Sequence, residues 1–140
     1  MKIYFASSIR GSHSPESSDV NKKIIEHLRK YGTVLTEHIG NDDIENIGEE
    51  ELTDREIHDR DWKWLEEADL MIAEVSDPSL GVGYEIGRAS EHGKKILCLF
   101  KSGEKRLSAM IRGCENVLTE DYSDIEEALK KIDDFILRIS

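Results

Sequence analysis

The feature that most constrains the fold is a regular alternation of short apolar runs with longer segments of helical periodicity. Strands are predicted at residues 2–6, 33–36, 70–75, 95–100 and 116–119. Helices are predicted at about residues 17–31, 48–68, 83–93, 107–112 and 124–139. Such alternation is typical of a parallel sheet whose right-handed crossovers place helices on both faces. We therefore expect an α/β fold, a single-domain Rossmann-like (flavodoxin-like) five-stranded parallel sheet over residues 1–140, with its active site at the carboxyl ends of the strands.

The last predicted helix carries its own start signal and a clear apolar face. Ser123 and Glu126 have the spacing of a capping box, in which each side chain bonds a backbone amide of the other's turn. The apolar positions of this helix fall on one side, at Ile125, Leu129, Ile132 and Ile136.

Composition limits the kinds of partner. A formal charge of −11 with no basic stripe argues against a nucleic-acid polymer, whereas a small phosphorylated molecule needs only one local anion site. Cys98 lies in an apolar run and Cys114 in a loop, with no CxxC spacing, so reduced thiols are expected rather than a zinc site or a disulfide. No stretch resembles a signal segment or is long enough to span a membrane. A soluble, cytoplasmic protein is expected.

Glu85 is the first candidate catalytic residue. It follows a buried strand and a turn-rich loop, so it is predicted to lie in the first turn of a helix. There the free backbone amides and the helix dipole favour the anion, so the carboxylate is expected to stay ionised and available as a nucleophile. The alternative is an ordinary acidic residue at a helix start, which is common.

Asp61 is the second candidate, because it interrupts an apolar stripe. Ile57, Asp61, Leu65 and Ala68 recur on one face of the predicted helix. A partly buried acid is costly unless it is paired or used, which makes Asp61 a candidate for proton transfer. The alternative is a structural ion pair at the edge of the stripe, with Arg55, Arg60 or His58 as the partner.

The loop after the first strand suggests an anion site. Ser7, Ser8, Arg10 and Gly11 supply hydroxyls, a guanidinium and a glycine that lets backbone amides approach a phosphate. Ser79 and Ser108 are weaker candidates for the same site, and His38 could reach the same cleft. Ser79 is otherwise a turn residue after Pro78, Ser108 a helix cap, and His38 an ordinary strand-end residue.

A dinucleotide or metal cofactor is not expected. In the segment from Gly81 to Ile86, isoleucine stands where the dinucleotide fingerprint needs its third glycine or alanine, and the segment follows the third strand rather than the first. The chain has no Walker lysine, and its histidines show no metal-binding spacing. The chemistry is therefore expected to need no cofactor.

Six blocks of sequence carry a family resemblance: YFASSIRG at 4–11, GTVLTEH at 32–38, HDRD at 58–61, AEV at 73–75, PSLGVGYEIGRA at 78–89 and LSAMIRG at 107–113. In this order they resemble the 2′-deoxynucleoside 5′-phosphate N-hydrolase (Rcl) family of the nucleoside 2-deoxyribosyltransferase superfamily. The resemblance covers nearly the whole chain.

The resemblance implies an N-glycosidase that releases a free base from a deoxynucleoside monophosphate. Glu85 would be the nucleophile that forms a covalent sugar intermediate, Asp61 the acid that assists the leaving base, and Tyr4 a residue that holds the nucleophile and the sugar. Candidate substrate and phosphate contacts are Ser8, Ile9, Arg10, Gly11, His38, Ser79, Gly81, Ser108, Ala109 and Met110. Ser108 would reach in from the other subunit of a homodimer.

Several activities remain open at this point. A related transferase would pass deoxyribose between free bases, and a CMP-type N-glycosidase would cleave a ribonucleotide. Arg10 with Ser79 and Ser108 favours phosphorylated substrates over nucleosides. A silent nucleotide-binding module is the third class, and it would be expected to have lost Glu85 or Asp61.

Overall fold

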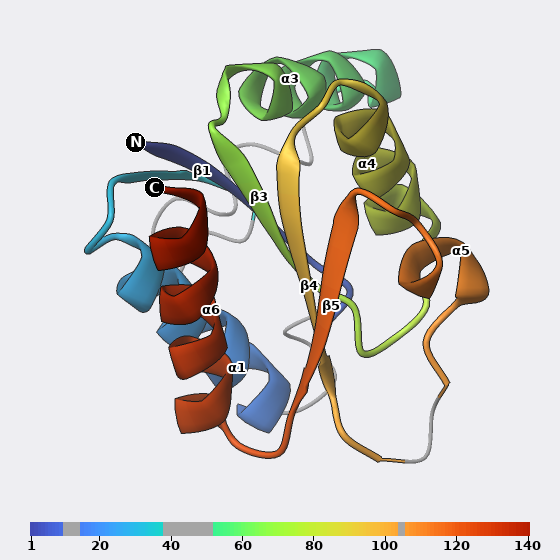
Figure 1. The fold of residues 1–140 in the computed structure, drawn as a ribbon. Helices are drawn as coiled ribbons and strands as arrows, with labels where there is room; N and C mark the ends of the chain where they lie inside the picture. The colour runs from blue at the N-terminus through green and yellow to red at the C-terminus, as the bar shows by residue number, and fades with distance from the viewer. Residues whose placement is uncertain (10–14, 38–51, 104–105) are drawn as a thin grey trace.

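The strands form one parallel sheet. A computed structural model describes residues 1–9, 15–37, 52–103 and 106–140 of the chain. Its strands are β1 (Lys2–Ser7), β2 (Thr33–Leu35), β3 (Leu70–Glu74), β4 (Lys95–Lys101) and β5 (Val117–Tyr122). Their order is β2-β1-β3-β4-β5 and every neighbouring pair is parallel (Figure 1). The predicted fold class is therefore confirmed.

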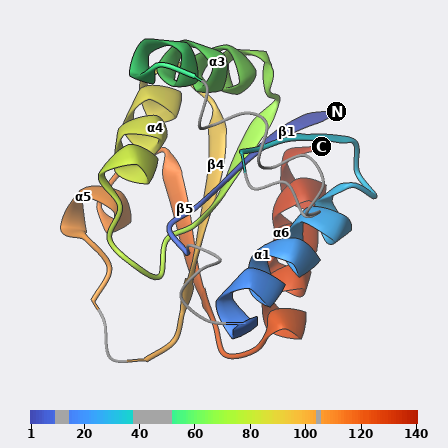
Figure 2. The same ribbon diagram turned by 180° about the vertical axis from the view of Figure 1, so that it is seen from behind.

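Helices cover both faces of this sheet. They are α1 (Pro15–Leu28), α3 (Asp54–Glu67), α4 (Leu80–Glu91), α5 (Ala109–Arg112) and α6 (Ile125–Ile139). Helices α1 and α6 lie together on one face, while α3 and α4 lie on the other with α5 beside α4 (Figures 1 and 2). Within the described ranges, no helix has the length and apolar character needed to cross a membrane.

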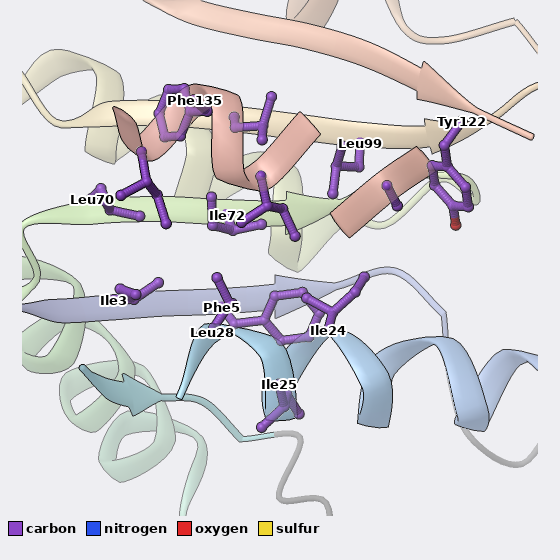
Figure 3. Packing of buried hydrophobic residues seen from close by; sticks show 14 residues of the cluster. Ile3, Phe5, Ile24, Ile25, Leu28, Leu70, Ile72, Leu99, Tyr122 and Phe135 are labelled. Atoms are coloured by element: carbon purple, nitrogen blue, oxygen red, sulfur yellow. The ribbon is translucent and has the colours of Figure 1, made fainter. Parts of the chain in front are cut away.

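Alternation along β1 decides which side chains reach the α3–α4 side. Ile3 and Phe5 belong to the core under α1 and α6, where residues of β1, β3 and β4 pack with both helices (Figure 3). Tyr4 and Ala6 belong to the opposite core, together with Leu65 of α3. Successive strand residues point to opposite faces, so Tyr4 is directed toward the helices that carry the candidate acids.

Several helix starts differ from the prediction. Helix α4 begins at Leu80 rather than at residue 83, because the Ser79 hydroxyl accepts a hydrogen bond from the Val82 amide (3.2 Å) and caps the helix. The predicted Ser123–Glu126 capping box is also wrong, by one residue. Asp124 is the N-cap of α6 and accepts from the Glu127 amide at 2.9 Å, while the Glu127 carboxylate accepts from the Ser123 amide at 2.6 Å.

The apolar face of α6 is confirmed. Ile132 and Ile136 are buried, and Ile125 and Leu129 pack partly buried against the same core. Helix α3 is shorter than predicted, because the Thr53–Glu56 capping box fixes its start at Asp54. The part of that prediction at residues 48–51 lies outside the described residues.

Candidate active site

A cleft of about 560 Å³ lies between α3, α4 and the carboxyl ends of the strands. This is the edge of the sheet at which an open α/β fold binds its ligands. The volume falls within the range of small-molecule sites. The residues that line the cleft are Ser7, Ser8, Glu37, Asp54, Ile57, His58, Asp61, Trp62, Leu65, Pro78, Ser79, Leu80, Gly81, Val82, Tyr84, Glu85 and Arg88.

Glu85 and Tyr4 meet in this cleft. The Tyr4 hydroxyl, on a residue only 1% exposed, donates a hydrogen bond to Oε2 of Glu85. Because α4 begins at Leu80, Glu85 lies in the second turn and not, as predicted, in the first. The helix dipole acts mainly within the first turn, so the tyrosine hydroxyl rather than the helix start supports the anion. Burial and the nearby Glu85 carboxylate raise the pKa of Tyr4 well above its ordinary range, so the hydroxyl remains a donor.

Glu85 is not the freely ionised carboxylate that its helix position suggested. Burial raises its pKa from 4.5 to about 7. The hydrogen bond from Tyr4 lowers that pKa, while repulsion from the Asp61 and Glu37 carboxylates raises it further. The expectation of a firmly ionised Glu85 is therefore wrong, since desolvation outweighs the hydrogen bond.

Asp61 lies at the edge of the apolar face of α3. Leu65 and Ala68 of the same stripe are buried, and the Asp61 side chain is 13% exposed. Its Oδ1 accepts from Arg60, at 3.0 Å from Nε and 2.9 Å from Nη2. The ion pair that was the structural alternative is thus present. Asp61 nevertheless lines the same cleft as Glu85, and both contacts go to Oδ1, so Oδ2 stands outside this ion pair.

One wall of the cleft was not predicted. His58 and Trp62 of α3 face Tyr84 and Arg88 of α4. The Tyr84 hydroxyl lies 2.8 Å from Nε2 of His58 and accepts from Nη1 of Arg88 at 3.1 Å. The Arg88 guanidinium also stacks 3.7 Å from the centroid of the Trp62 ring. The spacing of four residues within each pair was the available signal, since it places both members on one helix face.

Of the predicted substrate and phosphate contacts, Ser8 and Ser79 both line the cleft. The Ser8 hydroxyl accepts from the Asp77 amide at 3.0 Å. Gly81 lines the cleft, but Ile9 is buried and lines neither the cleft nor the groove beside it. The predictions for Arg10, Gly11 and His38 lie outside the described residues.

Ser108 and Met110 line a second groove of about 980 Å³ that adjoins the cleft. Ser8, Pro78, Ser79, Leu80, Val82 and Tyr84 line both spaces. Large apolar side chains are exposed here, with Leu80 97%, Met110 82% and Tyr84 51% accessible to solvent. Ala109 begins α5 and is exposed, but lines neither space.

The family model described as nucleoside 2-deoxyribosyltransferase matches residues 3–128. The chain belongs to the nucleoside 2-deoxyribosyltransferase family. Among curated relatives, a 5-hydroxymethyl-dUMP N-hydrolase of Tetraodon nigroviridis is 46% identical over 137 residues, covering 93% of this chain and 95% of the relative. A protein of the same name from Danio rerio is 51% identical over 131 residues, covering 90% of each chain.

A solved structure shares the fold. The CMP N-glycosidase BcmB of Clostridium botulinum superposes with a TM-score of 0.68, covering 95% of this chain and 98% of that chain. The two sequences are 23% identical. At this identity the comparison supports the doubly wound architecture of the deoxyribosyltransferase family and does not extend to the substrate.

The raised pKa predicts a pH-dependent stability effect for Glu85→Gln. A carboxyl group with a folded pKa of about 7 and an unfolded value near 4.5 binds more protons in the folded state, so stability falls as pH rises between the two values. Glutamine lacks this penalty. The melting temperature of Glu85→Gln relative to wild type should therefore increase from about pH 5 to about pH 8.

Calorimetry or thermal-shift measurement at both pH values checks this expectation. Glu91→Gln is the control, because it removes an exposed carboxylate from the same helix. An equal difference at both pH values for Glu85→Gln would contradict a raised pKa.

Proposed function

We propose that the protein hydrolyses the N-glycosidic bond of 2′-deoxynucleoside 5′-monophosphates, releasing the free base and 2-deoxyribose 5-phosphate. The observation that carries the proposal is the meeting of Glu85, bound by Tyr4, with Asp61 in one cleft that also contains Ser8 and Ser79. The N-hydrolase names of relatives that match over nearly the whole chain support it.

The first step breaks the bond to the base. The Glu85 carboxylate attacks the anomeric carbon of the sugar, and the carbon–nitrogen bond breaks with its electron pair moving to the base. A protonated Asp61 donates its proton to that base. The Tyr4 hydroxyl holds the Glu85 carboxylate in place. The product of this step is a free base and a covalent glycosyl ester on Glu85.

The second step returns the enzyme to its starting state. Asp61, now ionised, takes a proton from water as the water oxygen attacks the anomeric carbon. The ester bond to Glu85 breaks and its electron pair returns to the carboxylate. Atoms and protons balance over the two steps, and no external group is consumed except one water molecule.

The 5′-phosphate is proposed to bind at the Ser8 and Ser79 end of the cleft, where Arg10 and Gly11 follow in the sequence. The Ser8 hydroxyl already accepts from the Asp77 amide, so its own proton is available for a phosphate oxygen. Phosphate binding orients the sugar, and this remote binding energy can raise the rate of the chemical step.

The relatives also suggest a base. Both are named for 5-hydroxymethyl-dUMP, so we propose this nucleotide as a substrate of this protein. We propose that the base binds against the wall formed by His58, Trp62, Tyr84 and Arg88, since aromatic and guanidinium groups stack on nucleobases. Base exchange is the second candidate activity, favoured by the description of the matching family.

We further propose a cytoplasmic homodimer. A second copy is the occupant that we assign to the groove beside the cleft, because Leu80, Tyr84 and Met110 line this groove and expose large apolar side chains. In such a dimer Ser108 would complete the phosphate site of the partner. The free thiols Cys98 and Cys114 suit a reducing compartment.

A substrate panel tests the activity. Deoxynucleoside monophosphates, including 5-hydroxymethyl-dUMP, should release base with a kcat/KM at least about a hundredfold above that of the matching nucleosides, because charge-assisted hydrogen bonds contribute about 1.5–3 kcal/mol each.

Glu85→Gln should lose about three orders of magnitude or more in rate. The free base released is measured by chromatography. Incubation with CMP detects cleavage of a ribonucleotide, and addition of a second free base detects base exchange. The proposal would be wrong if nucleosides were cleaved as fast as their monophosphates, or if the Glu85→Gln protein were active.

A second prediction concerns the acid. Asp61→Asn should slow cleavage of dUMP much more than cleavage of its 5-fluoro derivative, because the more acidic leaving base needs less protonation. The two rates are compared for wild type and variant. Arg60→Gln is the matched control, since it removes the ion-pair partner of Asp61 and leaves the acid itself. Equal losses for both leaving groups would assign Asp61 to positioning instead.

A third prediction concerns the shared site. Glu85→Gln and Ser108→Trp proteins should each be nearly inactive, yet a mixture that exchanges subunits should regain about a quarter of wild-type activity, because half of the dimers would contain one intact site. Analytical ultracentrifugation of the wild-type protein measures whether its mass in solution is that of a dimer. An active monomer, or exchange without any rescue, would place Ser108 in the site of its own chain.

A further inference from the structure

Glu74 is an ionisable residue in a fully buried part of the sheet. It ends β3, is 0% exposed, and pairs in register with Ser7 of β1 and Leu99 of β4. An ionisable group in such a place is costly unless its hydrogen bonds are satisfied. The two-step mechanism does not use Glu74, so its presence calls for another reason.

The side chain of Glu74 is surrounded by donors. Oε1 accepts from the Ser76 amide at 2.7 Å, and Oε2 accepts from the Ser76 hydroxyl at 2.6 Å. The Tyr122 hydroxyl, at the end of β5, donates to the same Oε2. Burial raises the pKa of Glu74, and the hydrogen bonds from Ser76 and Tyr122 oppose that shift. Both carboxylate oxygens are therefore engaged, and Ser76 is held by two of its polar groups.

These contacts tie the loop after β3 to the neighbouring strands. The Ser76 hydroxyl also accepts from the Lys101 amide at 2.8 Å, at the end of β4. One residue further on, the Asp77 amide donates to the Ser8 hydroxyl at 3.0 Å, and the Ser8 amide donates to the Glu74 carbonyl at 2.8 Å. Glu74 thus stands at the junction of the ends of β1, β4 and β5 with the loop that leads to α4.

The loop fixed in this way carries the hydroxyls assigned to the phosphate. Ser79 caps α4 only three residues beyond Ser76, and Ser8 and Ser79 line the cleft together. A displaced loop would change the separation of these two hydroxyls, while the Tyr4 hydroxyl still binds the Glu85 carboxylate from β1. A small displacement of the groups that position a substrate can lower the reaction rate strongly.

We propose that Glu74 is a positioning residue for the 5′-phosphate: its carboxylate fixes the loop at residues 75–79 against β1, β4 and β5, so that Ser8 and Ser79 meet the phosphate together. This inference rests on the proposed function. Glutamine does not reproduce these contacts, because an NH₂ group at the Oε2 position forces the Ser76 and Tyr122 hydroxyls to accept instead of donate, and their protons lose the acceptor that the carboxylate provides.

The test compares the phosphate preference, which is the kcat/KM for a deoxynucleoside monophosphate divided by that for the same deoxynucleoside. Glu74→Gln should lower the value for the monophosphate at least about tenfold while changing that for the nucleoside less than about twofold. The inhibition constant of inorganic phosphate against nucleoside cleavage should rise in parallel. Tyr122→Phe removes one donor and keeps both Ser76 contacts, so it should show the same pattern with a smaller change.

Ile132→Ala is the control for destabilisation, because Ile132 is fully buried under α6, on the opposite face of the sheet. It should leave the phosphate preference unchanged. Ser76→Ala removes the hydroxyl that joins Glu74 to Lys101 and provides the same test if Glu74→Gln does not fold. A wild-type enzyme without phosphate preference overturns the proposed function and this inference together. A wild-type preference that Glu74→Gln and Ser76→Ala retain overturns the role of Glu74 alone.

Discussion

The site depends on the parallel pairing of β1 with β3. Their register brings Ser7 opposite Glu74, so both strands end at the same level of the sheet. From there the chain leaves β1 toward α1 on one face and β3 toward α4 on the other. Diverging connections open a crevice that neither helix fills. The cleft with Ser8, Ser79 and Glu85 lies at this switch point, and none of these residues would meet if the two strands were not neighbours.

The same architecture creates a conflict at Glu85. In the mechanism that we propose, burial would protect the covalent intermediate from side reactions, yet burial also disfavours the anion that has to attack. Among the described residues, the hydroxyl of Tyr4 donates a hydrogen bond to this carboxylate, and the position of Tyr4 follows from its inward-facing place on β1. A pKa of about 7 leaves a substantial ionised fraction at neutral pH while the carboxylate remains poorly solvated. A poorly solvated anion with a single hydrogen bond is a stronger nucleophile than one surrounded by water, so the partial loss of charge is offset by reactivity.

Sequence periodicity predicted the strands, the helices and the stripe that places Asp61 on the inner face of α3. It misplaced the start of α4, because glycines at 81 and 83 suggested a loop while the capping hydroxyl of Ser79 outweighed their low helix propensity. The ionisation of Glu85 was beyond sequence reasoning, because desolvation depends on neighbours distant in the chain. Its bond to Tyr4 joins residues 81 positions apart, and only the family resemblance suggested that pairing.

Charge explains why phosphate recognition needs such careful construction in this protein. Glu37, Asp54, Asp61 and Glu85 all line the cleft, so a dianionic substrate enters a region rich in carboxylates. In the proposed site a phosphate would be tolerated only where donors offer direct hydrogen bonds, and we assign this role among the described residues to the hydroxyls of Ser8 and Ser79. The buried Glu74 carboxyl group lies close to that place, and burial raises its pKa. Its donors from Ser76 and Tyr122 satisfy its oxygens inside the protein, so the group organises the loop without competing for the donors that the phosphate requires.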